Sequence, residues 1–282
     1  MRVATNFQHQ VALQRLQDAN TNLASSTSQI TSGLRAQRFS EIADDANQLL
    51  KLQDLQSNTT TFIKNIESAT SRLEAQENAL NSLSDLLVEA ANLYTLARNE
   101  NSPETRATLA PKAQGVAETF ENIFTTQFNG RYIFSGQGSE RSPLIGNLTA
   151  NPDPGDPPPT TYYGGDTEKP SVVVGPGQAQ EYGVTGDNVG FSRMVAGFEA
   201  LIFGLENDSE PDLDASIDFL RQAQKDLGDM FGEVGGDMAG LDLVKERHEN
   251  AELFITERVD ELEKADVAEA MTKFSQEQAQ LE

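Results

Sequence analysis

The sequence predicts a mainly α-helical protein with a β insert (α+β). We expect its N- and C-terminal segments to form a long antiparallel coiled-coil-like bundle, with a small β domain in the middle. Two stretches repeat an apolar residue at alternating steps of three and four, the pattern of helices that pack in bundles. Between them, residues 130–190 are rich in proline and glycine, which is typical of short strands and turns.

The first repeat is the clearest signal in the chain, and only Thr59 and Gln76 interrupt it with polar side chains. Its positions are Leu52, Leu55, Thr59, Phe62, Ile66, Ala69, Leu73, Gln76, Leu80, Leu83, Leu87, Ala90 and Tyr94. A helix over residues 46–98 would be about 80 Å long, because each residue adds about 1.5 Å. The repeat therefore predicts a rod.

The second repeat keeps its phase across Gly235 and Gly236. Its positions are Leu213, Ile217, Leu220, Gln224, Leu227, Phe231, Val234, Met238 and Leu241, continued with a shift at Val244, His248, Ala251, Ile255 and Leu262. The constant phase favours one continuous helix, although the letters VGGD also suit a turn. We expect the buried seam of the rod to include Leu73, Leu80, Leu83, Leu87, Leu227 and Phe231.

These patterns divide the chain into five segments. Residues 1–43 form an N-terminal assembly helix and connector, and 44–129 form the first half of the rod. Residues 130–190 form a β-rich outer domain with a Pro-rich loop at 151–159. Residues 191–265 return as the second half of the rod, and 266–282 form a C-terminal assembly helix.

The two terminal helices have apolar faces too thin to hold a helix alone in water. We therefore expect these faces to be buried between neighbouring subunits. The predicted assembly residues are Leu13, Leu16, Leu23, Ile30, Leu34, Val267, Met271, Phe274 and Leu281. The pattern stops at Glu282 without a capping residue, so we expect the natural chain to continue.

Helix starts can be placed from capping residues. Asp44 or Asp45 is expected to open the first rod helix, because Asp caps free N–H groups and favours the positive end of the helix dipole. Ser102 and Pro103 predict an N-cap and first helical position. That helix should run to about Phe128 and bend near Pro111 and Gly115.

The stretch FNGRYIFSG, residues 128–136, follows the first helical half and places aromatic residues between two glycines. We interpret it as a strand that leads out of the rod. Tyr132 and Phe134 would share one face of this strand and Ile133 would occupy the other.

Composition excludes several classes of function. The formal net charge of −23 repels nucleic acid and anionic lipid, so neither is an expected partner. The chain has no Cys, which excludes disulfides and thiolate chemistry. No run of about 18 apolar residues predicts a membrane span, and the N-terminus lacks the apolar core of a cleaved secretory signal.

No catalytic motif or metal-ligand spacing is found, so we expect no enzyme, no metal and no cofactor. His9 lies among Gln and Asn near the N-terminus, which favours a surface role over a chemical one. His248 falls on the apolar face of the second repeat and is expected to be tolerated there.

Short motifs then resemble a known family. Ile30 to Arg35 (ITSGLR) and Ala43 to Ala46 (ADDA), with Gly33, Leu34, Arg35, Asp44 and Asp45, resemble the N-terminal signature of the flagellin superfamily. ADVAEA at residues 265–270 resembles its C-terminal helix. The outer stretch is similar to that of the hook-associated branch, which forms the hook–filament junction, in Gly130, Arg131, Tyr132, Phe134 and Gly136.

The resemblance implies a non-catalytic adaptor at the hook–filament junction, on which flagellin assembles. It implies export through the flagellar type III system, from the cytoplasm to the extracellular flagellum. The implied partners are further copies of the chain in a ring, the other hook-associated junction protein, flagellin and a cytoplasmic export chaperone. A filament-forming flagellin, and a secreted coiled-coil effector or adhesin, remain alternatives.

Overall fold

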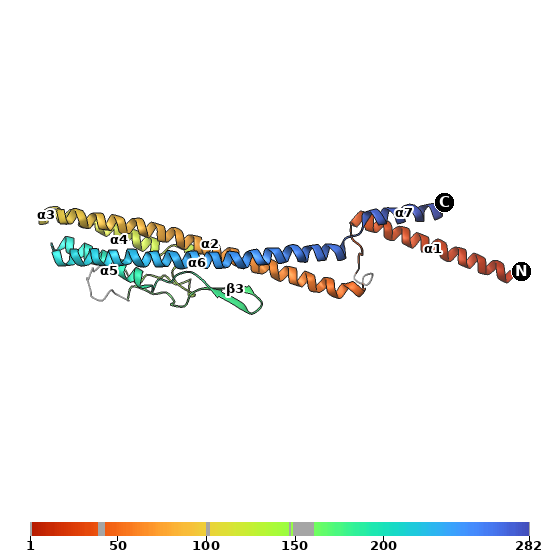
Figure 1. The fold of residues 1–282 in the computed structure, drawn as a ribbon, viewed down its shortest axis with the longest axis horizontal. Coiled ribbons are helices and arrows are strands. Elements are labelled where there is room, and N and C mark those ends of the chain that lie inside the picture. Colours follow the sequence, from red (N-terminus) through yellow and green to blue (C-terminus); the bar gives the residue numbers. More distant parts are fainter. Residues whose placement is uncertain (1, 39–42, 100–101, 147, 149–160, 282) are drawn as a thin grey trace. The chain divides into compact units, whose positions relative to one another are not determined.

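A computed structural model describes residues 2–38, 43–99, 102–146, 148 and 161–281. Helices dominate it, and the described strands are confined to the middle of the sequence, between Gln127 and Glu181 (Figure 1), which confirms the predicted fold class. The helices are α1 (Arg2–Ser32), α2 (Ala43–Asn99), α3 (Pro103–Ala107), α4 (Ala110–Phe124), α5 (Val189–Glu206), α6 (Glu210–Glu263) and α7 (Val267–Leu281). The strands are β1 (Gln127–Phe128), β2 (Arg131–Tyr132), β3 (Ser171–Gly175) and β4 (Gln178–Glu181). None of the described helices is long and apolar enough to cross a membrane.

The chain divides into two compact units. One comprises Met1–Thr61 with Arg247–Glu282, and the other comprises Phe62–Glu246. Both boundaries fall inside the long helices α2 and α6. The boundaries of the two units therefore differ from those of the five segments, which were predicted from the apolar repeats and the Pro- and Gly-rich stretch.

In the unit Phe62–Glu246, the apolar faces of α2 and α6 meet α4 and α5 in one continuous core (Figure 1). The predicted seam residues Leu73, Leu80, Leu83, Leu87 and Leu227 are buried in it. Phe231 is half-buried against the same core. In this unit, α2 contributes a buried residue at nearly every position of its apolar repeat. Burial of this apolar face stabilises the helix along this part of its length.

An aromatic cluster fills the core where α4 and α5 approach the segment after β2. The ring centroids of Phe124 and Phe134 are 5.7 Å apart, and Phe191 lies 5.1 Å from Phe124 and 5.0 Å from Phe134. Phe120 and Phe198 extend the cluster along the same two helices, with centroids 5.5 Å apart. These distances are those at which aromatic rings attract each other beyond their burial.

Helix α6 passes through Gly235 and Gly236 without a break, which confirms that the constant phase marked one helix. A Cβ added at either glycine would meet no atom within 4 Å, so no close neighbour requires glycine there. The continuity follows from packing, since Val234 and Leu241 on either side are buried in the core.

The helix predicted from Ser102 to Phe128 is wrong in its middle and its end. Ser102 caps α3 as predicted, but α3 ends at Ala107 and α4 spans Ala110–Phe124. Pro111 occupies the first turn of α4, where its missing N–H is tolerated and its ring disfavours a continuous helix through the preceding turn. The chain therefore breaks before the proline, and Gly115 lies inside the regular part of α4.

The strand predicted over FNGRYIFSG is also wrong beyond Tyr132. β1 and β2 pair as a two-residue hairpin around Asn129 and Gly130, whose φ angles of 51° and 74° suit a tight hairpin turn. Ile133 and Phe134 are both fully buried, so their side chains do not alternate between two faces. Turns follow β2 because the chain bends into the aromatic core instead of extending a sheet.

Two small antiparallel hairpins, β1–β2 and β3–β4, form separate sheets in this region, and β1 lies just before residue 130, where the β domain was predicted to begin. β3 pairs with β4 from Ser171 opposite Glu181, with an irregular step after Val173. The Pro-rich loop at 151–159 lies outside the described residues. The segment is therefore held by turns and by contacts with the helices more than by strand ladders.

In the other unit, α2 and α6 meet through a small apolar cluster of Leu49, Ile255 and Val259, with Leu52 and Leu262 packed against it. Hydrogen bonds between side chains flank this cluster. Gln56 donates to Thr256 at 3.0 Å, and Thr60 donates to Glu252 at 2.6 Å. This stretch of the two helices is consequently more polar than the core of the larger unit.

Candidate assembly surface

Helices α1 and α7 pair with each other through small residues. Ala19 and Ser26 of α1 and Ala270 of α7 are buried, and they are the only buried side chains described in these two helices. Asn22 donates a hydrogen bond to Glu277 across the pair, at 3.3 Å. The close approach uses residues without bulk, which a search for large apolar residues does not detect.

Most of the predicted assembly residues are not buried by the pairing of α1 with α7. Leu13, Leu16 and Leu34 of the N-terminal segment are exposed, as are Val267 and Met271 of α7. Leu23, Ile30 and Phe274 are half-buried, and the side chain of Leu281 lies outside the described residues. The exposed fraction reaches 59% at Leu13 and 53% at Met271, so the pair leaves apolar surface that its own residues do not cover.

The motif residues Gly33, Leu34 and Arg35 form the turn that ends α1. Gly33 has φ +70°, and its N–H donates to Gln29 O at 2.9 Å, which is a left-handed helix end that favours glycine. Ala265 N donates to Gly33 O at 3.0 Å and Arg35 N donates to Glu263 O at 2.7 Å. The motif thus joins the end of α1 to the connection between α6 and α7.

The two aspartates of the motif lie in the first turn of α2, since that helix begins at Ala43. Neither is its N-cap, but negative charge in a first turn still favours the helix dipole. Asp45 Oδ2 forms an ion pair with Arg35 Nη1 at 3.0 Å. Both side chains are at least one-third exposed, so the pair fixes the connector with only a small gain in stability. The side chain of Asp44 lies outside the described residues.

The second group of motif residues surrounds the β1–β2 hairpin. Gly130 lies in its turn, Arg131 is exposed, Tyr132 is half-buried and Phe134 is fully buried. Gly136 has φ +64°, and a Cβ added there would lie 2.2 Å from Asp166 O. The glycine is therefore required by both its backbone conformation and its neighbour.

Two polar side chains of α2 anchor this segment, and sequence reasoning assigned a role to neither. Arg72 is buried and its Nη2 donates to Tyr132 O at 3.1 Å, with Ile133 O and Gly136 O each at 3.4 Å. The signal in the sequence that pointed to this role was an arginine inside a long apolar repeat, because a charged residue that is buried requires polar partners.

Gln76 is the second anchor, and it explains one of the two interruptions of the first repeat. Its Nε2 donates to Ile133 O at 2.7 Å and to Val184 O at 2.9 Å, while its Oε1 accepts from Val184 N at 3.1 Å. Gly183 has φ +78°, and a Cβ there would lie 2.5 Å from Gln76 Oε1. Glycine at that position lets the amide approach the backbone.

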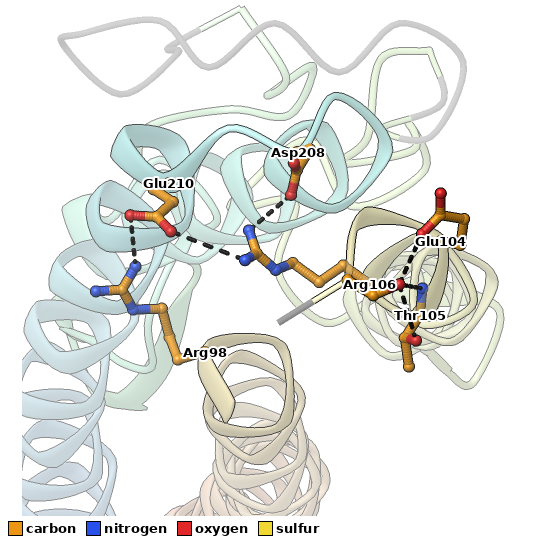
Figure 2. Close-up of polar contacts among 7 residues, drawn as sticks. Arg98, Glu104, Thr105, Arg106, Asp208 and Glu210 are labelled. Carbon is orange, nitrogen blue, oxygen red and sulfur yellow. Dashed lines mark hydrogen bonds and ion pairs between the residues drawn. The ribbon is translucent and has the colours of Figure 1, made fainter. Parts of the chain in front are cut away.

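Figure 2 shows a charged cluster where α2 and α3 approach the start of α6. Arg106 pairs with Asp208 at 2.6 Å and lies 3.8 Å from Glu210, which also pairs with Arg98 at 3.3 Å. The Arg106 side chain is only 13% exposed, so its pair is the best shielded of the set. The cluster joins helix ends and needs no ligand to balance its charge.

The cap of α3 lies beside this cluster in Figure 2. Thr105 N donates to Ser102 Oγ at 3.3 Å, and the Ser102 hydroxyl donates to Glu104 Oε2 at 2.7 Å. The hydrogen bond from Ser102 lowers the pKa of the Glu104 carboxyl. These contacts fix the start of the helix after the predicted N-cap.

The two histidines and two of the tyrosines lie in surroundings that suit structural roles. His9 is exposed on α1, and His248 is half-buried on α6. Among the described residues, no group of three or more His, Cys, Asp or Glu side chains could hold a metal ion. Burial raises the pKa of Tyr162 and Tyr163, whose hydroxyls donate to backbone carbonyls. These tyrosines therefore stabilise the fold as neutral donors.

The N-terminal half of the sequence is similar to a known protein family. Residues 3–139 match the family model described as the bacterial flagellin N-terminal helical region. The predicted resemblance to flagellins is confirmed. The N-terminal motif at 30–35 and 43–46 and the outer motif at 130–136 both fall inside the matched residues, so the flagellin likeness includes the α1 turn and the hairpin.

Two curated relatives are flagellar hook-associated protein 3 of Escherichia coli strain K12 and of Salmonella typhimurium strain LT2. The chain is 26% identical to the first and 25% identical to the second over 146 residues. Each match covers 51% of this chain and 46% of the relative. The chain thus spans about half the length of the curated relatives it matches.

Solved structures share the fold. A structure described as a flagellar hook-associated protein from Vibrio parahaemolyticus superposes with a TM-score of 0.68 at 21% identity, covering 80% of this chain and 100% of that one. FlgL from Bacillus cereus has a TM-score of 0.61 at 18% identity, covering 74% of this chain and 99% of that one. At these identities the likeness shows the fold alone.

Proposed function

We propose that this chain is a structural component of the bacterial flagellum and acts at the hook–filament junction as the adaptor on which flagellin assembles. The observation that carries the proposal is the match of residues 3–139 to the flagellin N-terminal region, joined with the sequence likeness to hook-associated protein 3. The hairpin motif around Arg131 and Tyr132 supports the junction role over the filament role. Such an adaptor acts by presenting surfaces and needs no catalytic centre.

In this proposal the exposed apolar residues of α1 and α7 supply the assembly contacts. Leu13, Leu16, Val267 and Met271 are exposed in the single chain. Full burial of one such side chain contributes about 1.5–3 kcal/mol, and the share that belongs to its still exposed surface, 40–59% of the side chain, is realised only when another chain covers it. Copies of the chain would therefore associate through their terminal helices into a ring.

The other partners follow from the same likeness. One end of the ring would contact the other hook-associated junction protein, and the opposite end would receive flagellin. A cytoplasmic chaperone would guard the chain before the flagellar type III system exports it. The protein would then be cytoplasmic before export and extracellular, on the flagellum, afterwards.

Deleting the gene tests the proposal directly. We expect cells with hooks but without filaments, and flagellin released into the medium. Labelling the protein on intact flagella should mark a single band at the junction. A label along the whole filament would favour a filament-forming flagellin, and unchanged motility after deletion would favour a secreted coiled-coil effector or adhesin.

A double variant tests the assembly surface itself. Leu13→Asp with Leu16→Asp places charge on the exposed apolar residues and should be exported but fail to restore filaments. Gln14→Asp with Gln17→Asp, at two exposed polar residues of the same helix turn, is the matched control and should restore them. Filaments restored equally by both variants would exclude this surface from assembly.

A further inference from the structure

A small cavity lies between α2, the β1–β2 hairpin and the residue after β4. Its volume is about 250 Å³, and it is lined by Ser68, Arg72, Phe128, Asn129, Arg131 and Tyr182. The lining combines two guanidinium groups with hydroxyl and amide side chains. Since one water takes about 30 Å³ of liquid, the cavity has room for a small polar group with several waters.

Arg72 is the unusual member of this lining. It is 8% exposed, and its Nε is a buried donor that has no hydrogen-bond partner. Its Nη2 donates to backbone carbonyl oxygens, which carry no full negative charge, and its guanidinium also interacts with the Tyr182 side chain. Within the described residues, no carboxylate forms an ion pair with it. A buried guanidinium without a counter-ion is costly, so the site favours an incoming anion.

The surroundings of Arg72 add to this preference. Burial lowers the pKa of its guanidinium, Tyr182 raises it, and the positive charge of Arg131 lowers it. Two like charges therefore face one cavity, and an anion between them would relieve their repulsion. Arg131 also lines a larger neighbouring cavity with Glu140 and Asp166, but it makes no ion pair with either.

We propose that Arg72, Arg131 and Tyr182 form an anion-binding pocket whose ligand is a carboxylate. A guanidinium binds carboxylate oxygens through charge-assisted hydrogen bonds, and the Tyr182 hydroxyl adds a neutral donor. The chain's net charge of −23 repels a multiply charged anion more strongly than a singly charged one, which favours a single carboxylate between the two arginines. The carboxylate comes either from a small molecule or from an acidic side chain of a second copy, which carries 44 such residues.

The test for a small carboxylate uses the full chain and sodium acetate. The side-chain Nε–Hε signal of Arg72 is followed by nuclear magnetic resonance, with sodium chloride at equal ionic strength as the blank. We expect a saturable shift with acetate. Arg131→Gln should weaken the affinity at least about tenfold, because it removes one charge-assisted partner. Arg141→Gln, an exposed arginine that lines only the neighbouring cavity, is the matched control and should bind as the parent does.

The test for a second copy measures self-association of the same three proteins by sedimentation equilibrium. If acetate gives no saturable shift, but self-association is weakened in Arg131→Gln and kept in Arg141→Gln, the carboxylate belongs to a neighbouring copy. Absence of both effects overturns the proposal, as does tighter binding of inorganic phosphate than of acetate. The outcome does not depend on the flagellar role, because neither readout uses filaments.

Discussion

The side-chain amide of Gln76 forms a closed pair of hydrogen bonds with the backbone of Val184. Its Nε2 donates to the carbonyl at 2.9 Å, and its Oε1 accepts from the N–H at 3.1 Å. A third bond joins the same Nε2 to Ile133 O. A side chain of the long helix α2 thus satisfies the backbone of two distant segments that have no strand partner at those positions.

We expect Gln76→Leu to lower the free energy of unfolding by about 2–4 kcal/mol, because it leaves the buried N–H and C=O of Val184 without their side-chain partner and Ile133 O with only the 3.4 Å contact to Arg72. Chemical denaturation measures the change. Gln224→Leu is the matched control, since Gln224 is the polar member of the second repeat and is exposed. It should change stability by less than about 0.5 kcal/mol. Equal effects of both substitutions would show that the Gln76 bonds contribute nothing.

Gln76 and Gln224 also show which features the sequence predicts and which it does not. Both interrupt an apolar repeat, and the repeats correctly predicted the helices around them. The partners of Gln76 lie 57 and 108 residues away, and no local pattern connects them. The same holds for Arg72, whose role depends on the chain bending back after β2. Local periodicity predicts helices well, but contacts between irregular segments depend on the packed structure.

Gly136 should tolerate alanine poorly. Its φ of +64° disfavours a side chain, and a Cβ would lie 2.2 Å from Asp166 O and 2.6 Å from Glu168 O. We expect Gly136→Ala to cost about 3 kcal/mol or more. Gly130→Ala is the control, because Gly130 has φ +74° but no atom within 4 Å of an added Cβ. It should cost only about 1–2 kcal/mol, from the backbone conformation alone. Thermal or denaturant unfolding of both variants would reveal whether the close contact matters.

Replacing either glycine of the Gly235–Gly236 pair in α6 with alanine should increase the stability of the fold. Gly235→Ala and Gly236→Ala remove backbone freedom at exposed helix positions where nothing lies within 4 Å of the new Cβ. Each should stabilise the chain by about 1 kcal/mol. Gly197→Ala in α5 should instead destabilise it, since its Cβ would lie 2.8 Å from Leu220. A loss of stability in the α6 variants would contradict a regular helix at this point.

The buried seam predicts a large penalty for charge. Leu80 is fully buried on α2, whereas Val88 on the same helix is 56% exposed. Leu80→Asp should cost several kcal/mol and lower the melting temperature sharply, because a carboxylate there has no partner. Val88→Asp should leave the melting temperature nearly unchanged. Similar melting temperatures for Leu80→Asp and the parent would refute the seam.

The terminal helices are expected to exchange their backbone hydrogens much faster than the core of α2 in the isolated monomer. Among the described side chains, α1 buries only Ala19 and Ser26, and α7 buries only Ala270. Little apolar burial opposes local opening, so the free energy of opening should be low. Hydrogen exchange read by mass spectrometry compares peptides of α1 and α7 with peptides from 73–94. Protection of both terminal helices should appear when copies assemble, and strong protection of both in a confirmed monomer would show that the pair is stable without neighbours.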